Sequence, residues 1–312
     1  MKYLIFIVVI FIISCNVCVC QTDIKKLEVT YGTYIESIHN LNFVEGKYEI
    51  VFWIWINSKD GIFNPEDEID IAQSVSTQYS NVYIDSSTAG VYHIECKVNA
   101  TILNLFNVSN FPFDRQKLIL NVEFANYSTN DLNINLDNKQ SKIIPEYLYG
   151  WETKSKFYKK SINYGSNFGS LTSKDPISYP TISLEMNLSR NAWNLYFKSF
   201  LTLLLSFILA IISLLYPNEN SEEKIGLIVG SLFTTVGNKY VTDDILPIQN
   251  SLNLSDKLHL LTILVITLIA AFAIIEQRMK LPDRNKTDFS MFLIFSFLFF
   301  GGCIYFTLQA MN

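Results

Sequence analysis

The chain changes its hydrophobic pattern near residue 190. Before this point short β-type runs follow one another. Tyr48 to Asn57 is rich in β-branched and aromatic residues throughout, and apolar and polar residues alternate clearly from Lys117 to Phe124. Alternation with a period of two predicts half-buried β-strands. Clusters of turn-forming residues, such as Asn126 to Asp131, separate these runs. We therefore expect residues 21–190 to form an all-β sandwich.

After residue 190 long apolar runs follow one another. Three of them, within residues 193–216, 256–277 and 288–311, reach the length that a helix needs to cross a bilayer. A further helix is expected at residues 222–243, between the first two runs. With it we expect four crossings in a transmembrane domain of residues 191–312.

The helix expected at residues 222–243 is too polar to lie in lipid on every side. Its uncharged part, Ile225 to Asn238, is too short to cross a bilayer unaided. A polar helix among apolar helices usually lines water, because exposed polar groups are costly in hydrocarbon. The pattern therefore predicts a helix that lines an ion pore.

The N-terminus has the layout of a secretory signal. Lys2 precedes an apolar run, and small or polar residues follow it up to Gln21. We expect a signal peptide at residues 1–20; a lipoprotein signal with Cys15 lipidated is the alternative. Either signal predicts that the β half is exported. Cleavage leaves Cys96 and Cys303, one in each half, so no disulfide is expected.

Composition and motifs argue against other classes of function. The net charge is −5 and no basic stripe is present, so nucleic acid is not an expected partner. The three histidines are scattered, and no phosphate-binding loop, zinc-ligand spacing or nucleophile elbow occurs. We therefore expect no enzyme, with no catalytic residue, metal site or cofactor. Lysine and arginine crowd residues 278–286, which places this link in the cytoplasm and the β half outside.

A loop motif connects these features to a known family. In residues 110–116 two aromatic residues flank a proline that fixes a turn, which alone indicates only a tight turn with its own apolar cluster. Together with the apolar runs, with Glu223-Lys224 before the polar helix and Pro247 after it, the loop resembles the pentameric ligand-gated ion channels (Cys-loop receptors) of bacterial type. The resemblance covers nearly the whole chain after the signal.

The chain also departs from the family pattern. Asn104 and Leu118 stand where the family has the two cysteines that bracket the loop, as in bacterial members. Ser58 stands where a tryptophan is usual, and the first apolar run lacks the family's proline. These departures argue against the family's usual aromatic ligand site, while the expected fold does not depend on them.

The resemblance implies an all-β extracellular sandwich plus a four-helix transmembrane bundle, with five subunits around a central pore. It implies a multi-pass protein of the plasma or inner membrane that contacts lipid and forms a homo-pentamer. The function would be a ligand- or proton-gated, cation-selective channel, with permeant cations and an unknown small-molecule agonist or protons as partners. The alternatives are a non-conducting membrane sensor or assembly subunit with the same fold, and a plain membrane-anchored binding sandwich.

Helical spacing and the resemblance together assign the pore-lining residues. They are Glu222, Glu223, Gly226, Gly230, Phe233, Gly237 and Tyr240. The glutamates would admit cations, or they merely complement the helix dipole. Phe233 would close the pore by dewetting, or it packs as an ordinary aromatic residue. Gly226 and Gly230 also match a close-packing helix motif.

Two further groups of residues follow from the resemblance. Contacts that couple the sandwich to the helices are expected at Glu45, Phe111, Pro112, Phe113, Asp114, Arg190 and Pro247, with a buried ion pair between Asp114 and Arg190. Aromatic residues near loops at the subunit junction could hold a cationic amine, or could belong to the sandwich core. They are Tyr127, Tyr164, Phe168 and Tyr179. Grouped carboxylates, which raise one another's pKa, would instead suit protons as agonist.

Overall fold

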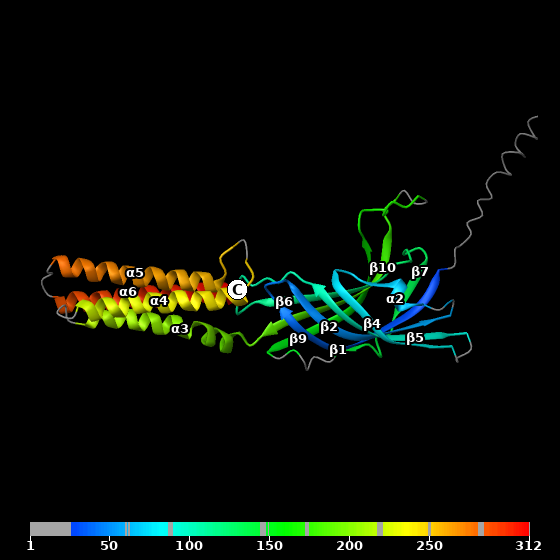
Figure 1. Cartoon of the computed structure of the whole chain (residues 1–312), viewed down its shortest axis with the longest axis horizontal. Coiled ribbons are helices and arrows are strands. Elements are labelled where there is room, and N and C mark those ends of the chain that lie inside the picture. The colour runs from blue at the N-terminus through cyan, green and yellow to red at the C-terminus, as the bar shows by residue number, and fades with distance from the viewer. Residues whose placement is uncertain are drawn as a thin grey trace, which may run out of the picture.

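The computed structural model describes residues 26–59, 61, 63–86, 90–143, 148, 150–171, 175–216, 221–248, 251–279 and 284–311. The expected signal peptide lies outside these residues. The described chain is elongated, with the strands at one end and the long helices α3 to α6 at the other (Figure 1).

Ten strands form two sheets in the described residues. They are β1 (Leu27–Asn42), β2 (Lys47–Ser58), β3 (Ile69–Ile71), β4 (Ser74–Asp85), β5 (Tyr92–Leu103), β6 (Arg115–Phe124), β7 (Leu132–Leu136), β8 (Lys142–Ile143), β9 (Trp151–Asn163) and β10 (Ser178–Arg190), with a short helix α2 (Pro65–Glu68) before β3. The first sheet has the order β4-β5-β2-β1-β7, and the second has the order β3-β6-β10-β9. β1 pairs antiparallel with β2 but parallel with β7 and β8, so the first sheet is mixed.

The two sheets pack face to face around one apolar core. Every second residue of β2 is buried, including Ile50, Phe52 and Ile54, because successive side chains of a strand point to opposite faces of the sheet. Leu120 of β6 and Met186 of β10 belong to the same core from the second sheet. Burying a side chain of this size stabilises the fold by about 1.5–3 kcal/mol.

Two tryptophans lie on the outer face of the first sheet. The Trp55 indole lies directly over Gly32, its cross-strand partner, so a Cβ at position 32 would collide with the ring. The Trp53 indole donates a hydrogen bond of 3.1 Å to Glu36, which also accepts one of 2.9 Å from Lys97. Glycine in β1 is therefore needed for close approach of the indole.

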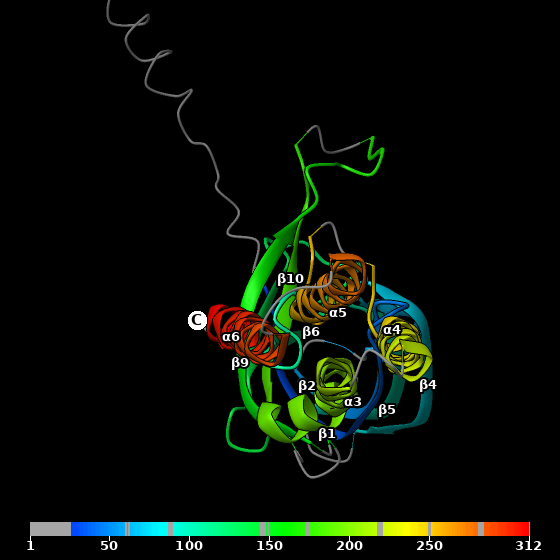
Figure 2. The same ribbon diagram turned by 90° about the vertical axis from the view of Figure 1, so that its left-hand side faces the viewer.

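The helices are α3 (Ala192–Ile212), which a 3₁₀ turn (Ser213–Leu215) extends, α4 (Ser221–Ile245), α5 (Leu254–Met279) and α6 (Arg284–Met311). Figure 2 shows them nearly end-on, with α4 and α6 on opposite sides of the group. α4 packs beside α3 and α5. α6 approaches α5 closely where Leu261 contacts Gly302, which has no side chain.

The expected fold class, an all-β sandwich plus a four-helix transmembrane bundle, is wrong. The described residues are of mixed α/β composition, with five α-helices and a first sheet that contains parallel pairs. Three helices are long and apolar enough to cross a membrane: Ala192–Leu215, Leu254–Arg278 and Lys286–Met311. They are consistent with a membrane protein. α4 does form where a helix was expected, but charged residues at both of its ends leave it too polar to count as a span.

Candidate functional site

The two faces of α4 have different surroundings. One face is buried against the neighbouring helices and carries Lys224, Ile228, Ser231, Thr235 and Thr242. The three hydroxyls donate hydrogen bonds of 2.7–3.2 Å to carbonyl groups one turn earlier in α4. These polar side chains are therefore satisfied within the helix, and their burial leaves no hydroxyl without a partner.

The opposite face of α4 is exposed along its length. It carries every residue that was predicted to line a pore: Glu222, Glu223, Gly226, Gly230, Phe233, Gly237 and Tyr240. Phe233 is 75% exposed and Tyr240 is 74% exposed. A helix packed on one neighbouring layer only would normally bury its bulkiest apolar residues and expose its hydroxyls. α4 does the reverse.

The glycines of α4 leave open space beside the helix. A Cβ built on Gly226, Gly230 or Gly237 would meet no other atom within 4 Å. Within the described chain, no other helix therefore packs against these glycines. The close-packing motif expected of Gly226 and Gly230 has no partner inside the described chain, and only contact with another copy could give it one.

A buried ion pair anchors one end of α4. The Lys224 Nζ lies 2.7 Å from the Glu276 Oε2 of α5, and the two side chains are 4% and 1% exposed. Ile228, one turn further along α4, belongs to the apolar cluster that α5 and α6 share. This pair holds the Lys224 face of α4 against α5, while Glu222 and Glu223 are exposed.

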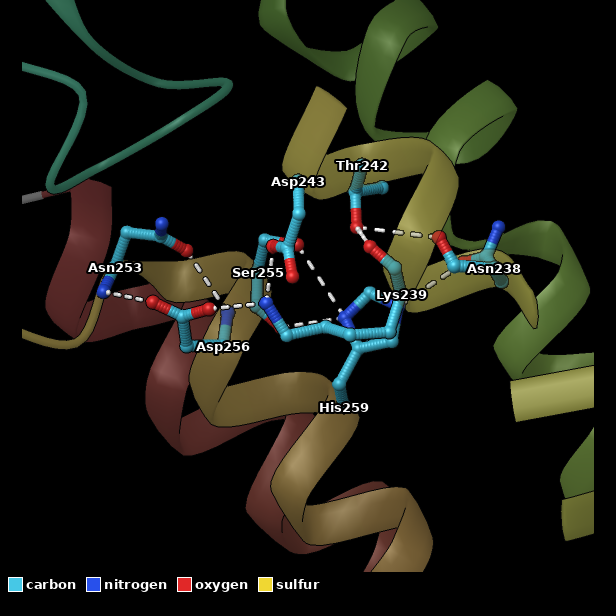
Figure 3. Close-up of polar contacts among 8 residues, drawn as sticks. All are labelled: Asn238, Lys239, Thr242, Asp243, Asn253, Ser255, Asp256 and His259. Atoms are coloured by element: carbon cyan, nitrogen blue, oxygen red, sulfur yellow. Dashed lines mark hydrogen bonds and ion pairs between the residues drawn. The ribbon is translucent and has the colours of Figure 1, made fainter. Parts of the chain in front are cut away.

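A polar network ties the other end of α4 to the start of α5 (Figure 3). The Lys239 Nζ lies 2.6 Å from the Asp256 Oδ1 and also contacts the Asp243 carboxylate one turn further along α4. His259 is fully buried between the helices. Its Nδ1 lies 2.7 Å from the Ser255 carbonyl oxygen, and its Nε2 lies 3.1 Å from the Asn238 side-chain oxygen.

The junction between the sheets and the helices contains the predicted ion pair. The Arg190 guanidinium donates a hydrogen bond of 2.8 Å to the Asp114 Oδ2, and the side chains are 11% and 1% exposed. The rings of Phe43, Phe111 and Trp151 lie 5.3, 5.2 and 4.1 Å from the guanidinium carbon. Burial lowers the pKa of Arg190 and the Asp114 carboxylate raises it, and an arginine so placed stays charged.

The loop before β6 contacts the helices at three places. Phe111 packs in a small apolar cluster with Leu246 at the end of α4. The Phe113 ring centroid lies 5.2 Å from that of Trp193 at the start of α3. The Ser109 carbonyl accepts a hydrogen bond of 3.0 Å from the Leu254 N–H at the start of α5. This loop therefore connects directly to three helices.

The other predicted coupling residues are less involved. Glu45 is exposed and pairs with Lys47 on its own hairpin, which lowers the pKa of Glu45. Pro112 follows a cis peptide bond inside the loop. Pro247 is half-buried beside Leu246.

Three of the four predicted ligand aromatics lie together. Tyr164, Phe168 and Tyr179 form a cluster with ring centroids 5.7–6.1 Å apart, next to the β9–β10 turn. The Tyr164 hydroxyl lies 2.7 and 2.8 Å from the two carboxylate oxygens of Glu123 and donates to them. Asp70 stands directly opposite Glu123 across the β3–β6 pair. The site therefore joins exposed aromatic rings with two carboxylates.

The pKa of Glu123 departs from its ordinary range. Burial raises it, the Tyr164 hydrogen bond lowers it, and the neighbouring Asp70 charge raises it again, for a net increase. Tyr127 lies elsewhere: its ring centroid is 5.5 Å from that of Phe63, and it packs on the sheet core. In the described residues no cluster of histidine, cysteine and acidic side chains could hold a metal ion.

Sequence reasoning missed Glu123, Asp256 and Glu276. Asp256 and Glu276 flank the apolar run of α5, and an acidic residue at such a place normally indicates only where a membrane span ends. Their only local signal is that Lys224 and Lys239 stand near the two ends of the preceding helix. Glu123 faces away from the apolar stripe of β6, and no local pattern relates it to Tyr164.

No protein-family model matches the chain, and no curated protein matches its sequence.

Proposed function

We propose that the chain is the subunit of a cation-selective ion channel, opened by a small-molecule agonist or by protons, and that it works as a homo-pentamer. The observation that carries this proposal is the exposed stripe of α4, which runs opposite to the face that α4 buries against α3 and α5. α3, α5 and α6 are apolar enough to contact lipid. A stripe of carboxylates and bare backbone at membrane depth is stable only against water, which an assembly of several copies would enclose.

The stripe has the parts that selection and closure of a cation path require. Glu222 and Glu223 are exposed at its first end, and rings of carboxylates attract cations and repel anions. Phe233 is the bulky apolar residue midway, and a ring of phenyl groups closes a narrow path by excluding water. The glycines of the stripe leave the path wide on either side of Phe233, because they carry no side chain and a Cβ there would meet no neighbour.

The aromatic cluster supports an agonist that is either a cationic amine or the proton. Exposed rings of Tyr164 and Phe168 attract a cation, and Glu123 with Asp70 supplies negative charge beside them. The raised pKa of Glu123 moves its titration toward neutral pH, as a proton-operated site requires. The loop that holds Asp114 and Phe111 contacts α4 and α5, and would carry the signal to the stripe.

The proposed orientation places the sheets outside the cytoplasm, in a plasma or inner membrane, with lipid around α6. The basic residues near the α5–α6 link support it, because such residues favour the cytoplasmic side. The resemblance of the loop and of Glu223-Lys224 to pentameric ligand-gated channels is the second support for the whole proposal.

The test is ion flux through the purified full-length protein in liposomes across a pH series. We expect flux of sodium or potassium over chloride, a lower cation preference in Glu222→Gln/Glu223→Gln, and flux without agonist in Phe233→Ala. Phe297→Ala is the matched control, since Phe297 is 82% exposed on α6, away from α4, and should leave closure intact.

Absence of flux from Phe233→Ala, in a protein shown to be oligomeric, would reject the channel and favour a non-conducting sensor. If Phe233→Ala and Phe297→Ala raise the flux without agonist equally, the role of Phe233 in closing the path is rejected, but the channel itself is not.

A further inference from the structure

One residue of α4 conflicts with a path for cations. Lys239 lies one turn before Asp243 and Asp244 at the outer end of the helix. An ammonium group facing the path would repel cations over several ångströms, because screening is weak near a low-dielectric wall. The inference below rests on the proposed function and concerns how this charge is handled.

The side chain of Lys239 turns toward α5 instead of the exposed stripe. Its Nζ lies 2.6 Å from the Asp256 Oδ1, and the side chain is 26% exposed. Asp243 contacts the same ammonium group from within α4. At neutral pH the two carboxylates outnumber the one ammonium, and Asp244 adds an exposed negative charge with no partner among the contacts of the described residues.

Asp256 is held in place for this contact. Its Oδ2 accepts a hydrogen bond of 3.0 Å from the Asn253 N–H, and the Asn253 side-chain oxygen accepts one of 2.8 Å from the Asp256 N–H. This reciprocal cap at the start of α5 fixes the carboxylate and leaves Oδ1 aimed at Lys239 (Figure 3). The ion pair is thus built into the beginning of the helix.

We propose that Asp256 is a specificity-determining residue: it lies on α5, away from the exposed stripe, and neutralises Lys239 so that the outer end of α4 presents net negative charge to permeant cations. Without it, Lys239 retains only Asp243 as a partner, and the excess of carboxylate over ammonium at this end of α4 becomes smaller. The preference for cations over anions at this end of α4 then depends on Asp256, which does not contact the permeant ions.

The test is the reversal potential of the full-length channel under a sodium chloride gradient. Asp256→Asn should lower the sodium-to-chloride permeability ratio several-fold, while its amide oxygen can still cap α5. Lys239→Met in the Asp256→Asn background should restore the ratio. Asp244→Asn is the matched control: it removes an equal charge nearby without releasing Lys239, so adding Lys239→Met should restore the ratio less.

A second measurement does not depend on conduction. Acetylation of lysines by an amine-reactive reagent, read by mass spectrometry, should be faster at Lys239 in Asp256→Asn than in the unaltered protein. Lys257 is the internal reference, because its Nζ lies 3.3 Å from the neutral Gln309 side-chain oxygen. Its labelling should not change.

The outcomes separate this inference from the proposed function. A conducting channel whose permeability ratio is unchanged in Asp256→Asn overturns the inference and leaves the channel standing. Unchanged labelling of Lys239 overturns the ion pair itself. An unaltered protein that carries no ions, but shows faster labelling of Lys239 in Asp256→Asn, overturns the proposed function and leaves the pair with a structural role only.

Discussion

Replacing Asp114 by alanine is the most informative perturbation of the junction between sheets and helices. The change removes the carboxylate that pairs with Arg190 and leaves the guanidinium among three aromatic rings, none of which can accept a hydrogen bond in its place. The Gln116 amide, which donates to the same carboxylate oxygen at 2.5 Å, loses this acceptor and keeps only the Asn107 carbonyl oxygen at 2.7 Å. Asp114→Ala therefore leaves a buried guanidinium without its carboxylate and one N–H of the Gln116 amide without its acceptor.

The cost can be worked from the burial of the pair. With side chains 1% and 11% exposed, solvent screens the pair little. Breaking such a pair from one side costs about 3–5 kcal/mol. For a unit of about 150–250 residues, each kcal/mol lowers the unfolding temperature by about 2–4 °C, so we expect a decrease of about 6–20 °C.

Scanning calorimetry of the purified protein in detergent measures this decrease directly. Glu28→Ala, which removes an exposed carboxylate from β1, is the control and should change the unfolding temperature little. Adding Arg190→Met to Asp114→Ala should recover most of the loss, because a methionine fits the aromatic cage without a charge. Losses that simply add in the double variant would refute the ion-pair reasoning.

The same variants address function. If the channel forms, Asp114→Ala should alter assembly or gating and leave the permeability ratio unchanged, because Asp114 is buried in the loop before β6 and is not part of the stripe of α4. Normal gating at normal surface levels would contradict this expectation.

Three further predictions follow from single contacts. Gly226→Ala should keep the oligomer and raise helix stability by up to about 1 kcal/mol, because the added methyl meets no atom; loss of the oligomer in light scattering would instead show close packing between copies. Glu123 has a raised pKa in the folded state, so the free energy of unfolding should rise as pH falls from that pKa toward about 4.5. Glu123→Gln should be more stable than the unaltered protein near neutral pH and should lose this pH dependence. Unfolding temperatures of the two proteins that run parallel across pH would contradict this prediction. Gly32→Ala should displace the Trp55 indole and cost about 1–3 kcal/mol in a urea titration, and unchanged stability would show that the sheet yields to the methyl group.

Local periodicity determined much of the molecule before any contact was known. The alternation of β6 indicates that Leu118, Leu120, Val122 and Phe124 enter the core, because successive side chains of a strand point to opposite faces. The apolar runs of α3, α5 and α6 fix three helices that can cross a membrane. In α4 the spacing of Glu222, Phe233 and Tyr240 fixes one shared face, since helical geometry alone relates residues three and four apart.

The limits of local pattern appear in the fold class. A helix was expected at residues 222–243, and α4 forms there. Its charged ends make it unlike the three apolar spans. The fourth span was expected from the family resemblance, and the composition of α4 does not support it. The parallel pairing of β1 with β7 was equally hidden, because alternation has the same period in parallel and antiparallel sheets.

Tertiary structure alone decided which distant charges meet. Tyr164 finds Glu123 41 residues away, and Lys224 finds Glu276 52 residues away. Such pairs depend on sheet register and on the rotation of packed helices, which are set by the whole core. The sequence by itself therefore determined the elements and the exposed stripe of α4, while packing decided where each ionisable side chain is neutralised.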